Sequence, residues 1–84
     1  MSYSLRIKHS AAKALGRLSA PDRARLVAAI DRLADEPFAG GLLKGEFAGL
    51  RRLRVGSYRI VYEAIHEELT VLVVRLGHRR DVYD

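Results

Sequence analysis

Apolar residues change their spacing along the chain, and each spacing predicts a different element. In "SYSLRIKH" apolar and polar residues alternate, which predicts a short first strand. Over positions 9–19 the apolar residues recur at the spacing of one helical stripe. A second helix is predicted in "SAPDRARLVAAIDRLADEP", where Ser19 is a capping residue and Pro37 ends the helix. The two helices are expected to form an antiparallel pair.

Three more strands are predicted in the second half of the chain, after a loop, "FAGGLLKGEFAG", whose glycines we interpret as a source of flexibility. The strands span 50–55, 58–65 and 69–76. Gly56 and Ser57 form the turn between the first two, with glycine at the first central position, as a type II′ turn requires. The segment "HEE" forms the next turn.

The last strand, "LTVLVVRL", has apolar residues at both its odd and its even positions. We therefore expect it to be covered on both faces and central in the sheet. A chain of 84 residues is predicted to form one domain, 1–84. The expected fold class is α+β: a short N-terminal strand and a helix pair packed on an antiparallel meander, with about four strands in all.

The tight turn also determines which residues of the hairpin lie opposite one another. Arg54 is expected opposite Arg59, and Arg52 opposite Val61, so that the three arginines share the face turned away from the helices. Opposed like charges cost stability. We therefore interpret this face as a site for an anion; the alternative is a solvated face on which arginine stems cover apolar area. Arg51 is expected at the sheet margin and has no assigned role.

The composition is basic and rich in arginine. The chain has 15 Lys and Arg against 10 Asp and Glu, a formal charge of +5, and only Lys8, Lys13 and Lys44 are lysines. A basic balance fits either a nucleic-acid partner or a merely solubilising surface, and by itself it does not favour one over the other. The planar guanidinium of arginine is better suited to holding phosphate than an ammonium group is.

Other classes of protein are disfavoured by what the sequence lacks. Without cysteine there is no disulfide and no thiolate metal site, and no histidine and carboxylate pattern has metal-ligand spacing. No apolar run is long enough to cross a bilayer, and the N-terminus has no secretory signal. We expect a soluble, cytoplasmic protein that makes no membrane contact.

The stretch "LRRLRVGSYRIVYE", followed by "LTVLVVRLGHRRDVY", resembles the RelE/ParE superfamily of toxins from type II toxin–antitoxin systems, in particular its RelE branch. The resemblance covers nearly the whole chain and includes "LKG" before the second strand. It implies a ribosome-dependent endoribonuclease, an mRNA interferase. Such a toxin cleaves mRNA in the ribosomal A site by attack of the 2′-OH on the scissile phosphate, and so inhibits translation. The resemblance implies no metal and no other cofactor.

Site residues carry over from this resemblance by position. Arg59 would stabilise the scissile phosphate, Arg79 would donate a hydrogen bond to the leaving oxygen, and Tyr83 would orient the nucleotide or act as base. The catalytic candidates are Arg59, Arg79 and Tyr83; the candidates for binding RNA and phosphate are Arg52, Arg54 and Lys44; His78 is a candidate for proton transfer. Arg52 and Arg54 replace the usual lysines, so they keep the charge and lose a titratable amine.

The resemblance also implies partners: a cognate antitoxin that covers or distorts the site, the ribosome and mRNA, and operator DNA reached only through the antitoxin. Three alternatives stay open. The first is a ParE-like inhibitor of DNA gyrase, although Arg59, Arg79 and Tyr83 together favour the ribonuclease. The second is a nucleic-acid-binding module without catalysis, and the third is a decayed toxin that only binds its antitoxin.

Overall fold

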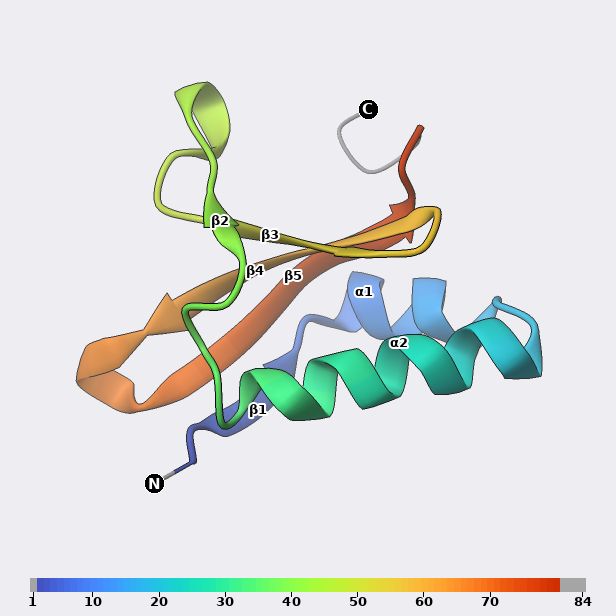
Figure 1. The fold of residues 1–84 in the computed structure, drawn as a ribbon, viewed down its shortest axis with the longest axis horizontal. Helices are drawn as coiled ribbons and strands as arrows, with labels where there is room; N and C mark the ends of the chain where they lie inside the picture. The colour runs from blue at the N-terminus through green and yellow to red at the C-terminus, as the bar shows by residue number, and fades with distance from the viewer. Residues whose placement is uncertain (1, 81–84) are drawn as a thin grey trace.

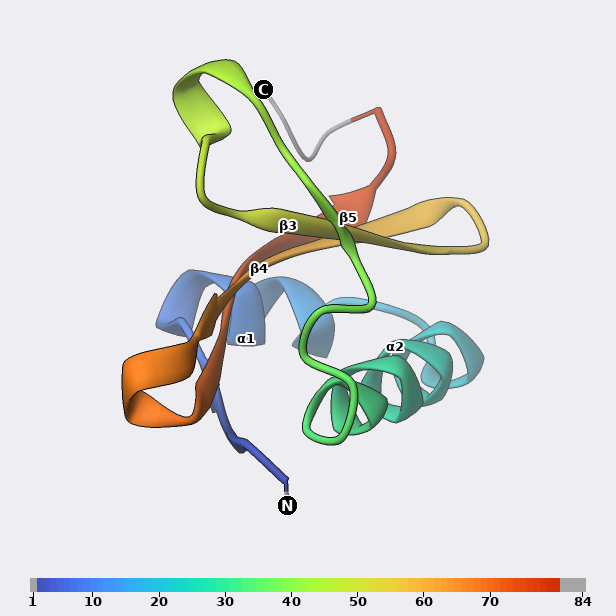
Figure 2. The same cartoon turned by 60° about the vertical axis from the view of Figure 1, so that its left-hand side comes forward.

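The structure, a computed structural model, describes residues 2–80, which form a five-stranded sheet with two helices on one of its faces (Figures 1 and 2). The helices are α1 (His9–Gly16) and α2 (Ala20–Leu33), and two short 3-10 turns are η1 (Gly45–Phe47) and η2 (His66–Glu68). The strands are β1 (Ser4–Ile7), β2 (Gly41–Leu42), β3 (Arg51–Val55), β4 (Tyr58–Ile65) and β5 (Thr70–His78).

The predicted α+β fold class is confirmed, with one strand more than the four expected. The spatial order is β1-β5-β4-β3-β2; β1 pairs with β5 in parallel, and the other neighbours are antiparallel. The additional strand, β2, lies in the segment predicted as loop. It pairs only Gly41 with Arg52 and Leu42 with Arg51, and two residues are too few to show a strand period. β5 is an interior strand, but the central strand is β4, and both helices lie on the same face of the sheet. The expectation that β5 is central and covered on both faces is therefore met only in part.

The β3–β4 hairpin has the predicted register. Arg54 lies opposite Arg59, and Arg52 lies opposite Val61. Gly56 has φ +60° and Ser57 has no positive φ, which agrees with the predicted type II′ turn. Local chain chemistry therefore fixes the alignment of these two strands.

The main core lies between the helices and the sheet. Ser19 caps α2, accepting a hydrogen bond from the backbone of Asp22 at 3.4 Å, and the helix ends at Leu33, four residues before the predicted stop at Pro37. The buried side chains of this core come from both helices and from β4 and β5: Ala11, Leu26, Ile30, Leu33, Ile60, Tyr62, Val71, Val73 and Leu76.

The loop after α2 is tied to the sheet by a buried tyrosine. Tyr62 is 0% exposed; its hydroxyl donates to the Pro37 carbonyl at 2.9 Å and accepts from the Gly40 N–H at 2.9 Å. A Cβ at Gly40 would lie 2.6 Å from the Arg52 carbonyl oxygen. The interpretation of the loop glycines as flexible is therefore wrong for Gly40, where close backbone packing requires glycine.

Arg51 has a structural role that the sequence pattern did not predict. Its Nη1 donates to the Gly40 carbonyl at 2.7 Å, and its guanidinium carbon is 4.9 Å from the centroid of the Phe38 ring. A charge-assisted hydrogen bond and a cation–π contact both hold the same loop. The loop carries the chain from α2 to β2, which pairs with the edge of β3 that is not paired with β4.

We predict that Tyr62→Phe lowers the free energy of unfolding by about 2 kcal/mol at neutral pH, because the Pro37 carbonyl and the Gly40 N–H lose their buried partner. Urea unfolding measures the change. The matched control is Tyr3→Phe, which removes an exposed hydroxyl that bonds His66 Nδ1 and should cost less. Equal losses in the two variants would contradict a special role for the buried hydroxyl.

The same variant should change the alkaline stability. Burial raises the pKa of Tyr62, partly offset by the hydrogen bond from Gly40 and the charge of Arg51. Below a pH of about 10 the phenol is protonated in both states, and its stabilisation is complete. As pH rises above that, the unfolded state ionises first and the native protein loses stability. Tyr62→Phe should lose less stability over this range.

Candidate functional site

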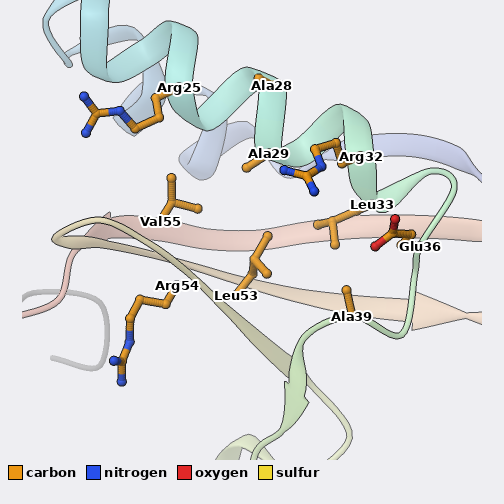
Figure 3. Close-up of a pocket in the computed structure, with 10 residues that line it drawn as sticks. All are labelled: Arg25, Ala28, Ala29, Arg32, Leu33, Glu36, Ala39, Leu53, Arg54 and Val55. Carbon is orange, nitrogen blue, oxygen red and sulfur yellow. The ribbon is translucent and has the colours of Figure 1, made fainter.

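The sheet face opposite the helices carries the predicted group of arginines. In β3 and β4 the apolar residues Leu53, Val55 and Ile60 pack toward the helices, so their neighbours Arg54 and Arg59 face the other way. Figure 3 shows Arg54 pointing away from α2, whereas Leu53 and Val55 point toward it. We call the face that carries Arg52, Arg54, Arg59 and Arg75 the arginine face.

Arg59 is the most enclosed of the arginines predicted here. Arg52 and Arg54 are exposed, whereas Arg59 is half-buried. Its Nη1 atom is buried and finds no hydrogen-bond partner within residues 2–80. A buried cationic donor without an acceptor is costly, which makes this atom a position where an anion would be stabilising.

Arg75 is a fourth arginine that the sequence pattern missed. It lies opposite Val61, which in turn lies opposite Arg52, so the three residues form one row across β5, β4 and β3. Counting back from the β4–β5 turn would place Val74 opposite Val61. A bulge between Val61 and Tyr62 shifts the register, and this shift places Arg75 on the arginine face. The sequence did contain one signal for this role, because Arg75 is the single charged residue in the apolar segment "LTVLVVRL".

The loop that contains η1 stands beside this face. In Figures 1 and 2 the segment around residues 45–47 (yellow-green) rises from the sheet on the side opposite the helices. Lys44, which precedes η1, is exposed. The guanidinium carbon of Arg75 lies 6.0 Å from the centroid of the Phe47 ring. The loop therefore brings a cation and an aromatic ring to the edge of the arginine face.

The end of β5 is attached to the hairpin turn. The backbone N–H of Arg79 donates to the Ser57 carbonyl at 2.8 Å, and Arg79 and Arg80 are exposed. His78 lies opposite Tyr58, and the two rings meet edge to face at 6.0 Å. Nδ1 of His78 accepts the backbone N–H of Arg80 at 3.3 Å. Arg79 is thereby held next to the hairpin that carries Arg59, whereas His78 shares the face of Tyr58.

Tyr58 connects the hairpin to the start of α2. Its hydroxyl donates to Oδ2 of Asp22 at 3.0 Å. This hydrogen bond, together with burial and the negative charge of Asp22, raises the pKa of Tyr58 above its ordinary value. Tyr58 is therefore a neutral phenol at physiological pH, and its contact with Asp22 is structural. Among residues 2–80, no cluster of three or more His, Asp or Glu side chains is placed to bind a metal ion.

Residues 5–83 match the family model described as the ParE toxin of type II toxin–antitoxin systems, parDE. The chain belongs to this family. Toxin RelG of Mycobacterium tuberculosis is 35% identical to the chain over 85 residues, which cover 99% of this toxin and 98% of RelG. The family match and the similarity to RelG together show that the chain is a type II toxin of the RelE/ParE superfamily.

Two solved complexes show the same fold. The toxin–antitoxin complex RelBE2 from M. tuberculosis contains a chain with a TM-score of 0.88 and 32% identity; the match covers 94% of this toxin and 100% of that chain. The RelE–RelB complex from Pyrococcus horikoshii contains a chain with a TM-score of 0.79 and 27% identity; the match covers 98% of this toxin and 100% of that chain. The fold of this toxin is therefore RelE-like.

The structure brings together part of the predicted site. Arg52, Arg54 and Arg59 share one face, and Arg79 is fixed beside the hairpin turn. Tyr83 lies outside the described residues. No helix among residues 2–80 is long and apolar enough to span a membrane.

A groove of about 350 Å³ separates α2 from β3 on the helix side of the sheet (Figure 3). Its floor is apolar and includes Ala29, Leu33 and Leu53, while Arg25 and Arg32 stand at its rim. Glu36 also lines the groove, so the charge around the apolar floor is mixed, with more cationic than acidic side chains. An apolar groove with this charge suits an amphipathic segment that is mainly acidic.

We predict that Arg54→Thr stabilises the toxin by about 0.5 kcal/mol at low salt, because it removes the like charge directly opposite Arg59. The gain should shrink as salt screens the repulsion. Thermal or urea unfolding over a salt series measures it. Arg6→Thr is the matched control, since Arg6 lies opposite Leu72. A gain equal to that of the control, or independent of salt, would contradict this account.

Proposed function

We propose that this toxin is an endoribonuclease that cleaves mRNA in the ribosomal A site and needs no metal ion. The observation that carries the proposal is the buried Nη1 of Arg59, a cationic donor without an acceptor among residues 2–80. It lies on a face with Arg52, Arg54 and Arg75. A phosphate bound there would supply the missing acceptor and relieve the repulsion between opposed arginines.

The proposed reaction begins with attack of the ribose 2′-OH on the adjacent phosphorus. The bond from phosphorus to the 5′-oxygen breaks, and the products are a 2′,3′-cyclic phosphate and a 5′-hydroxyl. Arg59 would hold the non-bridging oxygens, where negative charge accumulates in the transition state. Arg79 would hydrogen-bond the leaving oxygen, which takes its proton from water, since a guanidinium donates readily but gives up its proton with difficulty. Arg52, Arg54 and Lys44 would bind the neighbouring phosphates.

The proton of the 2′-OH needs an acceptor, and arginine is unsuited to that role. We assign it to Tyr83, because a phenol brought close to arginines ionises more readily. His78 is the second candidate. Its ring packs on Tyr58, on the other side of the sheet from Arg59, so it would have to act from the end of β5.

The solved relatives include toxin–antitoxin complexes, which supports an antitoxin as the partner of this toxin. We propose that an amphipathic acidic helix of that antitoxin lies in the groove between α2 and β3. The groove's apolar floor would take the helix's apolar stripe, and Arg25 and Arg32 would pair with its carboxylates. Operator DNA would be contacted through the antitoxin. The cytoplasm, where ribosomes and mRNA occur, is the proposed location.

The family model's description as a ParE toxin favours a second candidate, inhibition of DNA gyrase. The two functions predict different first events after the toxin is expressed without antitoxin. A ribonuclease stops translation first, whereas a gyrase inhibitor stops replication and causes DNA damage. A toxin that has lost its activity would stop neither process while still binding its antitoxin.

The deciding experiment adds the purified toxin to a cell-free translation reaction and maps mRNA 5′ ends by primer extension. We expect cuts inside A-site codons that require ribosomes. Arg59→Ala should reduce cleavage by about 100-fold or more, because it removes the charge at the scissile phosphate. Arg6→Ala, an arginine on β1, is the control and should cleave like the wild type.

Full-length mRNA and normal protein synthesis with the wild-type toxin would reject the ribonuclease. Supercoiling by purified gyrase would then be measured with the same preparation, and inhibition there would support the ParE-like function. Cleavage that persists in Arg59→Ala would keep the ribonuclease and reject the role given to Arg59.

A further inference from the structure

A series of side-chain contacts connects the start of α2 to the last residues of β5. The Ser19 hydroxyl accepts the backbone N–H of Asp22 at 3.4 Å, and Oδ2 of Asp22 accepts the Tyr58 hydroxyl at 3.0 Å. The Tyr58 ring meets the His78 ring edge to face at 6.0 Å. These segments lie together at one end of the molecule (Figure 1). The end of β5 is therefore held to the helix through two aromatic side chains.

His78 also holds the backbone that follows it. Its Nδ1 accepts the backbone N–H of Arg80 at 3.3 Å, which closes a short turn at the exit of the strand. The backbone N–H of Arg79 donates to the Ser57 carbonyl at 2.8 Å, one step beyond the pairing of His78 with Tyr58. Both residues of this turn are thus tied, one to the His78 ring and the other to the hairpin turn.

The alternation of side chains along β5 bears on where Arg79 lies. His78 shares the helix side of the sheet with Tyr58, whereas Gly77 lies opposite Arg59 on the arginine face. The residue after His78 is therefore expected on the side of the arginine face, next to the pair that Gly77 forms with Arg59. A change at His78 would move Arg79 without altering the arginine face itself.

We propose that Tyr58 and His78 are positioning residues for Arg79. Anchored by Asp22, the two rings hold the backbone of Arg79 so that its guanidinium reaches the phosphate bound by Arg59. The inference rests on the proposed ribonuclease function, in which Arg79 hydrogen-bonds the leaving oxygen. Such a contact depends on placement, since a displacement of about 1 Å caused by a distant substitution can cost about 100-fold in rate.

Two other accounts compete with this proposal. In the first, the Tyr58 hydroxyl only fastens the hairpin to α2, and its loss lowers stability without affecting Arg79. In the second, His78 itself takes the proton of the 2′-OH. The three accounts differ in which variants stay active and in whether the effect depends on Arg79.

Substitutions at His78 separate positioning from proton transfer in the ribosome-dependent cleavage assay. His78→Asn keeps an acceptor close to the place of Nδ1 but has no group that takes a proton at neutral pH. His78→Ala removes both the acceptor and the ring. We expect cleavage to fall about 10-fold or more in His78→Ala, and His78→Asn to recover most of that loss. Equal losses in the two variants would overturn positioning by His78 and support proton transfer.

A double substitution tests whether the effect of Tyr58 depends on Arg79. Tyr58→Phe removes the hydroxyl that reaches Asp22 and keeps the ring. It should slow cleavage in the wild type and have no further effect in Arg79→Ala, a non-additivity that a general loss of stability does not produce. Equal effects in both backgrounds would overturn the proposal. Tyr3→Phe is the matched control and should cleave like the wild type, and urea unfolding checks that each variant is folded.

Hydrogen exchange of the Arg79 amide, measured by NMR, tests the positioning without any cleavage. We expect this amide to exchange about 10-fold faster in His78→Ala and in Tyr58→Phe, because its bond to the Ser57 carbonyl opens more often. The Lys8 amide, which bonds the Val73 carbonyl, is the control and should not change. Unchanged exchange at Arg79 in a toxin that cuts mRNA would overturn this inference alone. Faster exchange in a toxin that cuts no mRNA would support the anchoring of Arg79 and reject the ribonuclease.

Discussion

The two-residue turn at Gly56 and Ser57 determines the arrangement on both faces of this sheet. It aligns β3 with β4, so that apolar side chains face the helices while Arg54 and Arg59 face the other side. A slip of one residue would exchange the two sets, burying guanidinium groups and exposing the core. Glycine at the positive φ of Gly56 therefore supports the core and the candidate site at once.

The arginine face costs stability, and the opposite face of the sheet offsets that cost. Opposed arginines repel, and Arg59 keeps a buried donor without an acceptor in the described chain. On the helix side, Tyr62 is fully buried and anchors the loop after α2 through two hydrogen bonds. β4 therefore carries the residue that anchors the fold and, three positions away, the residue proposed to bind phosphate.

How well the sequence predicted each feature depended on how local its cause is. The hairpin register follows from one turn, and the arginine face followed from that register. Gly40 and Arg51 owe their roles to contacts between distant segments, so spacing along the chain carried no signal for them. Arg75 reached the arginine face through a bulge in the β4–β5 pairing, and an alternating pattern assumes that no bulge is present.

A face built of arginines binds phosphate differently from one that includes lysines. A guanidinium keeps its charge across the physiological pH range and presents a planar fork to two oxygens at once. Under the proposed function, the face would hold the RNA backbone, and another group would take the proton of the 2′-OH. Under the proposed function, substrate binding and proton transfer would be divided between different parts of the sequence: binding on the sheet, and proton transfer by Tyr83. In such a site, truncating the tail would remove the chemistry and leave most of the affinity.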